Sequence, residues 1–545
     1  MPSNPTPPVP PAADYVVVGA GSAGCAVAAR LSADPSVTVT LLEAGGPDER
    51  PEIHRADAAS VLSLLTADWR GEIDWGYVTE PEAGMDGRGI PVARGKVLGG
   101  CSSVNALMWV RGSRHDYDRW VAEGATGWSY EEVLPYFRAA ESYSGGGSEL
   151  RGADGPVRVR QLDHPSPLAS AFVAAAGELG HVAASDGDYN GARQDGFGFL
   201  YQTNRDDAGR RCSAADAYLR PALDRPNLTV VTGARTTRLL LDGDRVTGVE
   251  YVLGGAPAQI RADREVIVSA GAFESPKLLM LSGLGPADHL RAHGIHCVRD
   301  LPGVGAGLQD HLFTPVCYQS LQEHPPEALL SEAGLFTHTP AADPAGPPDL
   351  QFTFGPVKFL PAGAPAEQWE GPGLTFAPIA VLPHSRGRVR LRDADPESNA
   401  VISAGYLSSA ADLEVLVYGV ELARELAATR AFDAFRGDEL GPGKDITTPA
   451  ELRDYVAANA TTLWHPAGTC RMGTGPDAVT DPELRVHGIE GLRVADASVM
   501  PSIVAGNTHA PSVMIGERAA AFALGTSQPP LTAARPTEGM QHVHP

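Results

Sequence analysis

The sequence predicts an α/β protein in which a discontinuous, Rossmann-like nucleotide-binding domain carries an inserted α+β domain, an antiparallel sheet covered by helices. The first observation is a βαβ pattern over residues 14–44, with glycines between its first strand and its helix. The second is that glycine-punctuated motifs return in the middle and at the end of the chain. The third is the stretch 318–373, where many prolines and short β-like segments indicate a second domain.

Each part of the βαβ pattern has a physical reason. Residues 15–18 are apolar, as in a strand buried on both faces, and 37–42 form a second such strand. Between them Gly19, Gly21 and Gly24 follow the G-x-G-x-x-G spacing: the first makes a tight turn, the second admits a pyrophosphate, and the third lets the helix approach the sheet. Glu43 ends the second strand and suits the hydroxyls of an adenosine ribose. The motif indicates a dinucleotide, without separating FAD from NAD.

The remaining elements follow along the chain. A helix is expected over 129–143, because Ser129 can cap it and two glutamates follow in its first turn. Further helices are predicted over 165–179 and 412–429, and one beginning at Ser275-Pro276 with proline in its first turn. Strands are predicted at 227–252 (antiparallel, turning at 242–244), at 265–270 and at 350–354.

These patterns predict a division into two domains. The nucleotide-binding domain comprises 14–160, 203–315 and 462–525. The second, substrate-binding domain comprises 161–202 and 316–461. Residues 1–13, which are proline-rich, are predicted to be a disordered lead-in, and 526–545 a flexible tail.

Composition restricts the possible functions. The net charge of −23 and the lack of a basic patch argue against a nucleic-acid partner. The six cysteines are scattered without metal-ligand spacing, so we expect reduced thiols and no metal site. The N-terminus has no secretory signal pattern and the chain no apolar stretch of transmembrane length, which predicts a cytoplasmic enzyme without a stable membrane anchor.

Four blocks, in order, resemble the glucose–methanol–choline (GMC) family of FAD oxidoreductases. They are the glycine motif with Glu43, the segment 94–105 (RGKVLGGCSSVN), the segment 271–286 (GAFESPKLLMLSGLGP), and a final group at 464–469 (WHPAGT), 494–498 (VADAS) and 506–511 (GNTHAP). The resemblance covers residues 14–524. Among family members the chain resembles choline oxidases and dehydrogenases and oxidases of aryl alcohols or hydroxymethylfurfural.

The resemblance implies FAD as the cofactor and a set of residues around it. Expected at the adenosine and pyrophosphate are Gly19, Ala20, Gly21, Ser22, Ala23, Gly24, Glu43, Ala44, Thr236, Ala270, Gly271 and Asp496. Expected along the rest of the cofactor are Trp75, Arg94, Val97, Leu98, Gly99, Gly100, Ser103, Asn105, Ala106, Met108, Ala497, Ala510 and Pro511. Members with covalently linked flavin have a histidine where this chain has Val104, so non-covalent FAD is predicted.

Two histidines are the predicted catalytic residues. An alcohol that loses a hydride must also lose its hydroxyl proton, which a histidine can accept at neutral pH. By the resemblance this base is His465, and the partner position, asparagine or histidine in the family, is His509. Histidines outside these motifs are interpreted as structural, including His311 in a family loop.

Three residues are weaker candidates for contacting substrate: Trp464, Phe354 and Glu332. Glu332 matches a cation-binding glutamate of choline oxidase, but Leu330 and Ser331 replace the aromatic pair found there. A quaternary ammonium needs aromatic faces, which argues against choline, and a structural hydrogen-bonding role is the preferred interpretation for Glu332.

The leading hypothesis is therefore an FAD-dependent oxidation of an alcohol to an aldehyde or ketone by hydride transfer to flavin N5, with electrons passing to oxygen or another acceptor. A choline-type oxidase or dehydrogenase is the alternative within the family. A non-redox FAD lyase of the same fold, and an NAD-binding or regulatory Rossmann protein, are the alternatives from other classes. Substrate identity, the electron acceptor and the oligomeric state do not follow from the sequence.

Overall fold

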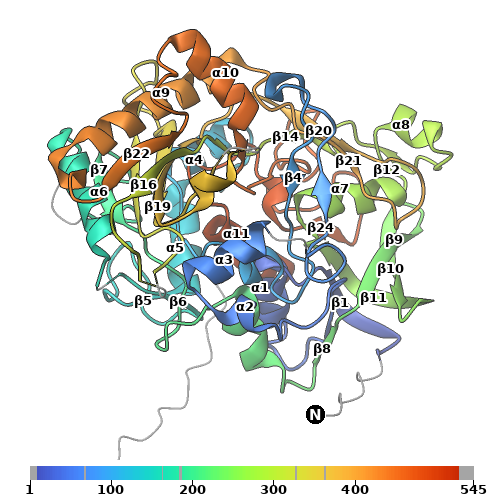
Figure 1. The fold of residues 1–545 in the computed structure, drawn as a ribbon. Helices are drawn as coiled ribbons and strands as arrows, with labels where there is room; N and C mark the ends of the chain where they lie inside the picture. Colours follow the sequence, from blue (N-terminus) through green and yellow to red (C-terminus); the bar gives the residue numbers. More distant parts are fainter. Residues whose placement is uncertain are drawn as a thin grey trace, which may run out of the picture.

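The computed structural model describes residues 9–66, 69–162, 164–182, 187–325, 328–360 and 364–526 (Figure 1). Of the predicted lead-in at 1–13, residues 1–8 lie outside the described residues, and Ala12 and Ala13 belong to a strand; of the predicted tail at 526–545, residues 527–545 lie outside the described residues. The first strand, β1 (Ala12–Val18), begins three residues before the predicted strand at 15–18, because Ala12 and Ala13 already pair with Arg261 and Ala262.

A seven-stranded mixed sheet forms the first layer, in the order β8-β2-β1-β11-β10-β9, with β24 beside β11. Its parallel strands are β1, β2 (Val39–Leu42), β8 (Leu228–Val231), β11 (Ala256–Val268) and β24 (Leu492–Val494). β9 (Ala234–Asp242) and β10 (Arg245–Leu253) join antiparallel. The antiparallel prediction for 227–252 thus fails for β8, whose residues continue the parallel sheet beyond β2. The strand predicted at 265–270 is the end of the long β11.

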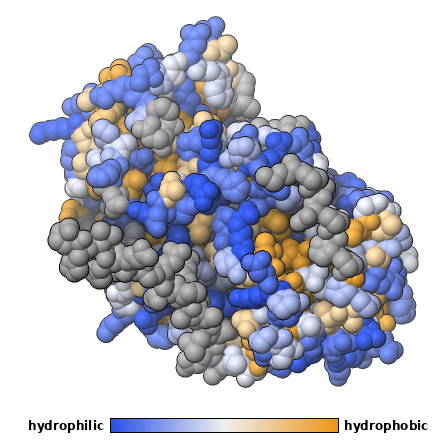
Figure 2. Space-filling model, turned by 90° about the horizontal axis from the view of Figure 1, so that it is seen from below, coloured by the Kyte–Doolittle hydropathy of each residue, from blue (hydrophilic) through white to orange (hydrophobic). Residues whose placement is uncertain are grey.

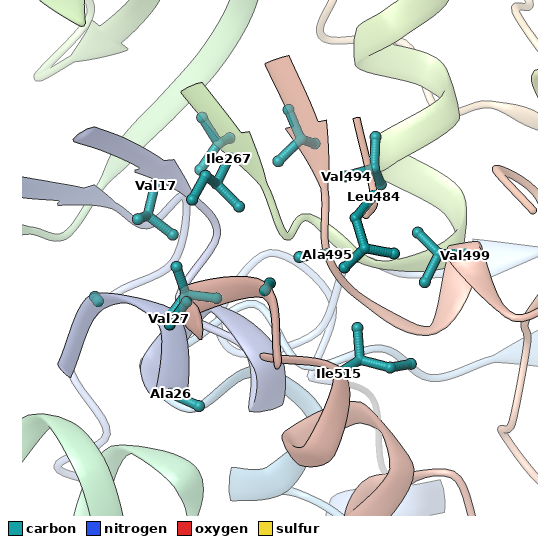
Figure 3. Close-up of a cluster of buried hydrophobic side chains, with 14 of the residues drawn as sticks. Val17, Ala26, Val27, Ile267, Leu484, Val494, Ala495, Val499 and Ile515 are labelled. Atoms are coloured by element: carbon teal, nitrogen blue, oxygen red, sulfur yellow. The ribbon is translucent and has the colours of Figure 1, made fainter. Parts of the chain in front are cut away.

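Two helices pack together under this sheet, α1 (Ser22–Leu31) and α11 (His509–Ala523), which lie 487 residues apart at their starts. The two helices approach closely at Gly516, which has no side chain. A Cβ there would overlap the backbone of Ala23. Figure 3 shows the apolar core between sheet and helices, where Val17, Ile267 and Val494 approach Val27 and Ile515. This packing holds the first and last segments of the chain against one site.

An eight-stranded antiparallel sheet forms the second layer, in the order β22-β16-β19-β18-β17-β7, with β15 and β23 attached beside β19. Its strands are β7 (Phe197–Leu200), β15 (Leu312–Phe313), β16 (Val316–Ser320), β17 (Ala333–Thr337), β18 (Leu350–Gly355), β19 (Gly373–Ala380), β22 (Arg436–Gly441) and β23 (Thr461–Thr462). Helices α6 (Pro167–Glu178), α9 (Ala410–Ala428) and α10 (Pro449–Asn459) accompany it. The first sheet draws its strands from segments assigned to the nucleotide-binding domain, apart from the first two residues of β1. The second sheet draws most of its strands from segments assigned to the substrate-binding domain, but β15 and Thr462 of β23 come from segments assigned to the other domain. The domain boundaries themselves stay a prediction.

The predicted helices form with changed ends. α6 and α9 lie within two residues of prediction, and Ser166 caps α6 by accepting from Ala169 N–H. α5 (Tyr130–Ala140) begins at the predicted capping box but ends early, because Glu141 continues into β5 (Glu141–Tyr143). The helix predicted from Ser275-Pro276 was wrong in its start: α7 (Gly271–Leu281) begins four residues earlier, where Asp496 accepts from Gly271 N–H, so Pro276 lies inside it.

The remaining described elements connect these layers. The helices are α2 (Pro51–His54), α3 (Ala58–Thr66), α4 (Arg114–Ala122) and α8 (Ala287–Ala292). The short strands are β3 (Tyr77–Val78), β4 (Pro91–Val92), β6 (Val157–Val159), β12 (Leu284–Gly285), β13 (Arg299–Asp300), β14 (Ala306–Leu308), β20 (Gly387–Arg390) and β21 (Val401–Ser403).

The surface agrees with the charged composition. Figure 2 shows that hydrophilic residues cover most of one face, with hydrophobic residues gathered near its middle. None of the described helices has the length and apolar character needed to cross a bilayer. In the described ranges no cluster of potential ligands could hold a metal ion, and all six cysteines are unpaired.

Candidate active site

Two adjoining cavities lie between the layers. The first, here called the glycine cleft, is lined by Gly19, Gly21, Glu43, Gly271 and their neighbours. The second, the histidine cavity, is lined by His465, His509 and mostly apolar side chains. Both include Ser22, Arg94, Cys101, Ala497 and Ser512 in their walls, so the two cavities adjoin each other.

The glycine cleft is shaped by backbone contacts that only glycine permits. Gly19 has a φ of +97°, and a Cβ there would lie 2.5 Å from the carbonyl oxygen of Ser269. A Cβ on Gly24 would overlap the carbonyl oxygen of Gly19, so α1 rests directly on the turn. The helix begins after Gly21 without a side-chain cap, which leaves its first N–H groups open to a phosphate in the cleft.

Polar groups along the cleft suit an adenine dinucleotide. Glu43 accepts hydrogen bonds from the N–H groups of Ala20 (2.8 Å) and Gly45 (2.7 Å), and burial raises the pKa of its carboxyl. The hydroxyl of Thr236 is buried without a partner. Asp496 accepts from Ser275 Oγ at 2.6 Å. The carboxylate at the end of β2 suits the ribose, and the free hydroxyl suits the base. The uncapped helix N-terminus suits the pyrophosphate.

Most of the residues predicted to bind the cofactor line one of these cavities. The glycine cleft includes Gly19, Gly21, Ser22, Ala23, Glu43, Ala44, Trp75, Arg94, Gly100, Thr236, Ala270, Gly271, Asp496 and Ala497. Asn105, Ala106 and Met108 line the histidine cavity. Ala20, Gly24, Val97, Leu98, Gly99, Ser103, Ala510 and Pro511 line neither cavity. Sequence reasoning missed Tyr77, which lines the cleft and donates to Glu274 at 2.6 Å, although it stands two residues from Trp75.

His465 is held by one buried carboxylate. Asp310 accepts four hydrogen bonds, from the N–H groups of His465 (2.8 Å) and His311 (2.9 Å) and from the hydroxyls of Tyr406 and Thr462 (2.6 Å each). These bonds tie the loop before β15 to the segment after β23. The position of His465 is therefore set by segments 155 residues apart.

A chain of hydrogen bonds determines which nitrogen of His465 is free. His311 Nε2 lies 3.1 Å from the carbonyl oxygen of Val381, which can only accept, so this nitrogen carries the proton. Burial lowers the pKa of His311 to about 3, so its Nδ1 is unprotonated. That Nδ1 lies 3.0 Å from His465 Nδ1, which must donate. Neutral His465 is then left with an unprotonated Nε2, 3.4 Å from the amide nitrogen of Asn507.

Burial, reinforced by His311 and Arg94, lowers the pKa of His465 well below its ordinary value. The imidazole is therefore neutral at pH 7 and able to accept a proton at Nε2. The contact with His311 was missed, because His311 lies 154 residues away and was interpreted as structural. Asn507 was also missed as a neighbour of His465, although it belongs to the block that contains His509.

His509 occupies the same cavity by a different attachment. It is the first residue of α11, and its Nδ1 lies 3.0 Å from Ser22 Oγ, at the start of α1. Its Nε2 is buried without a hydrogen-bond partner, and burial lowers its pKa to about 3. Neutral His509 thus offers one polar nitrogen to a ligand in the cavity. The structure brings both predicted histidines to one cavity, while the ring that touches His465 is His311.

Trp464 has an unusual backbone. Its φ of 62° is rare for a bulky residue and stores strain. Thr462 Oγ1 accepts from its N–H at 2.7 Å, and Arg94 donates to its carbonyl oxygen at 2.7 Å. Trp464 and Phe354 line the histidine cavity as predicted for substrate contacts. Glu332 does not; its carboxylate accepts from the N–H of Ser166 at 2.9 Å.

The chain is similar in sequence and in structure to known oxidoreductases. Two family models, both described as GMC oxidoreductase, match residues 13–313 and 383–516. The chain is 42% identical to an oxygen-dependent choline dehydrogenase of Brucella canis, over 94% of this chain and 96% of the relative. Its structure resembles a pyridoxine 4-oxidase from Mesorbium loti (TM-score 0.86, 36% identity, 94% and 99% covered). It also resembles an Aspergillus oryzae formate oxidase studied for modification of its FAD (TM-score 0.84, 28% identity, 94% and 98% covered).

Proposed function

The chain belongs to the GMC oxidoreductase family of FAD-dependent enzymes, and on that premise we propose how this protein oxidises an alcohol. The reaction converts a CH–OH group to an aldehyde or ketone, and the electrons pass on to oxygen or another acceptor. The observation that carries the proposal is the pair of hydrogen bonds that assigns an unprotonated Nε2 to His465, in a cavity that adjoins a dinucleotide-shaped cleft.

FAD fits the glycine cleft. The open N–H groups at the start of α1 would hold its pyrophosphate, Glu43 its adenosine ribose, and Thr236 would lie by the adenine. When bound, FAD supplies the hydride acceptor at flavin N5. Val104 lacks any nucleophile, so we propose that the cofactor is non-covalent.

The unpaired state of all six cysteines supports a cytoplasmic location.

His465 removes the hydroxyl proton of the alcohol. The proton goes to Nε2, and the positive charge that forms on the ring is stabilised by the Nδ1–H donated to His311. Asp310 keeps the backbone of His465 fixed while this occurs. His509 and Asn507 line the cavity with polar nitrogens that can hold the substrate oxygen as its negative charge develops.

Anaerobic mixing of the purified yellow protein with a panel of primary alcohols tests this function. We expect the absorbance of oxidised flavin to bleach with at least one of them, and an aldehyde to be recovered. A protein that holds FAD and bleaches with none of the panel, or releases cyanide from a cyanohydrin without bleaching, would contradict it. Hydrogen peroxide formed in air identifies oxygen as the acceptor.

A further inference from the structure

We propose that the alcohol oxidised here is uncharged, with an aromatic or branched hydrocarbon body, and that quaternary ammonium alcohols such as choline are poor ligands. The inference rests on the proposed function and adds the substrate class. It concerns the histidine cavity, where the substrate carbon must lie beside His465.

The cavity wall is mainly hydrocarbon. Apolar side chains from β15, β18, β19 and the β18–β19 connection face it, including Phe313, Phe354, Phe359, Ala377 and Ile379. Apart from Arg94, its polar side chains are uncharged, and they include the amides and hydroxyl of Gln351, Thr353 and Asn507. Such a wall stabilises a ligand by removing apolar surface from water, about 25 cal/mol per Å².

No aspartate or glutamate among the described residues lines this cavity. Asp310 and Glu332 stand beside residues of its wall, and both already accept hydrogen bonds within the protein. Asp310 accepts four hydrogen bonds from His311, His465, Tyr406 and Thr462. Glu332 accepts from the N–H of Ser166 and does not line the cavity. A cationic ligand would therefore find no counter-ion here.

The charged side chain in the wall has the wrong sign for choline. Arg94 lines both cavities, and its Nη1 donates to the carbonyl oxygen of Trp464. A second positive charge brought beside it would lose its hydration and be repelled. The aromatic rings alone do not offset this, because a desolvated cation–π contact contributes about 2 kcal/mol or somewhat more, less than the cost of burying an unpaired charge.

The aromatic residues instead make a wall of rings in mutual contact. Phe313 packs edge-on against Phe359 with ring centroids 5.2 Å apart, and lies 6.3 Å from Trp464. This arrangement suits a ring or a branched alkyl group by stacking and edge contacts. The 42% identical relative is named a choline dehydrogenase, so the inference separates this chain from that relative by its cavity.

A matched pair of alcohols tests the inference directly. Choline and neohexanol have the same shape and differ in that carbon replaces the quaternary nitrogen. Their dissociation constants are measured by titration calorimetry on the FAD-loaded His465→Ala variant, which blocks turnover. Their kcat/KM values are measured on the unmodified enzyme, with benzyl alcohol as a third substrate. We expect neohexanol to bind about 100-fold more tightly than choline, in keeping with the cost of burying an unpaired charge.

Tighter binding of choline than of neohexanol would overturn the inference, whether or not flavin is reduced. Tighter binding of neohexanol with no bleaching by any alcohol would leave the substrate class standing and remove the proposed oxidation. The two failures are thus distinguishable.

A charge placed in the wall gives a second test. Val357 lines the cavity and is partly exposed, so Val357→Glu can be accommodated, and Val357→Gln is its neutral control of the same shape. We expect kcat/KM for choline, relative to neohexanol, to be about tenfold higher in Val357→Glu than in Val357→Gln. Equal ratios in the two variants would show that charge in the cavity does not select the substrate, contrary to the inference.

Discussion

At the level of single residues, the protonation of His465 decides what the cavity can do. A catalytic base must have an accessible lone pair, and in a neutral imidazole only one nitrogen has it. Here the carbonyl of Val381 fixes the proton on Nε2 of His311, and Nδ1 of His311 in turn fixes the proton on Nδ1 of His465. His311 acts as a positioning residue, since it contacts the base rather than the substrate.

Removal of the base should separate chemistry from cofactor binding. His465→Ala is expected to lower the rate of flavin reduction by about 10²–10⁴-fold, the range for a positioned general base. FAD content should not change, because His465 does not line the glycine cleft. Stopped-flow spectroscopy measures the rate of flavin reduction, and the flavin-to-protein absorbance ratio measures the FAD content. An apoprotein would show instead that His465 is structural.

Replacement of His311 should reveal the tautomer chain. In His311→Leu the acceptor for His465 Nδ1–H is lost, so the proton can move to Nε2, and we expect reduction to slow by about 10-fold or more. His311→Gln can accept from His465 with its oxygen and donate to Val381 with its nitrogen, so it should retain most of the rate. Comparable rates for Leu and Gln, at matched melting temperatures, would contradict this role.

The pH dependence of flavin reduction follows from the lowered pKa of His465. Burial, with His311 and Arg94, keeps the ring neutral below the pH at which a free histidine protonates, about 6.5. The neutral form is the active base, so the rate should be constant from pH 9 down to about 6.5 and fall only at more acidic pH. Anaerobic stopped-flow traces across pH 5–9 measure it. An acidic limb centred above pH 6.5 would disagree.

At the level of elements, the contact between the β1–α1 turn and α1 has no room for a side chain. Gly24→Ala would place a methyl group on the carbonyl oxygen of Gly19, and backbone atoms cannot move aside cheaply. We expect a loss of about 1–3 kcal/mol in the free energy of unfolding, with reduced FAD occupancy. The matched control is Gly177→Ala in α6, where nothing lies within 4 Å and helix propensity favours alanine. Denaturant unfolding of both variants decides; equal stabilities would refute the contact.

At the level of the whole molecule, distant segments converge on one site. His465 follows β23 of the second sheet, whereas the glycine cleft belongs to the first sheet, so folding of both layers is needed to bring base and cofactor together. One hydrogen bond between the two parts runs from Arg94, which lines both cavities, to the carbonyl oxygen of Trp464 beside His465.

Non-covalent cofactor binding makes flavin retention a property of the folded molecule. After unfolding in guanidinium chloride and filtration, we expect all the yellow colour in the filtrate, because Val104 cannot form a link. Added FAD should in turn raise the melting temperature of apoprotein, since it binds only the folded state. Flavin that the filter retains together with the unfolded chain would contradict the prediction.

The sequence by itself determined the local parts of this protein: the βαβ unit with its glycines, the cap of α5, and the two histidine motifs, because turn geometry, helix capping and residue type act over a few neighbours. It placed Ser275-Pro276 at a helix start and interpreted His311 as structural. Only the tertiary structure decided where α7 starts and what His311 does. Asp496 sets the start of α7 from 225 residues away, and Val381 sets the protons on His311 and His465. Only the tertiary structure shows that no carboxylate lines the histidine cavity among the described residues. A sequence motif does not indicate which carboxylates lie outside a site and already accept hydrogen bonds.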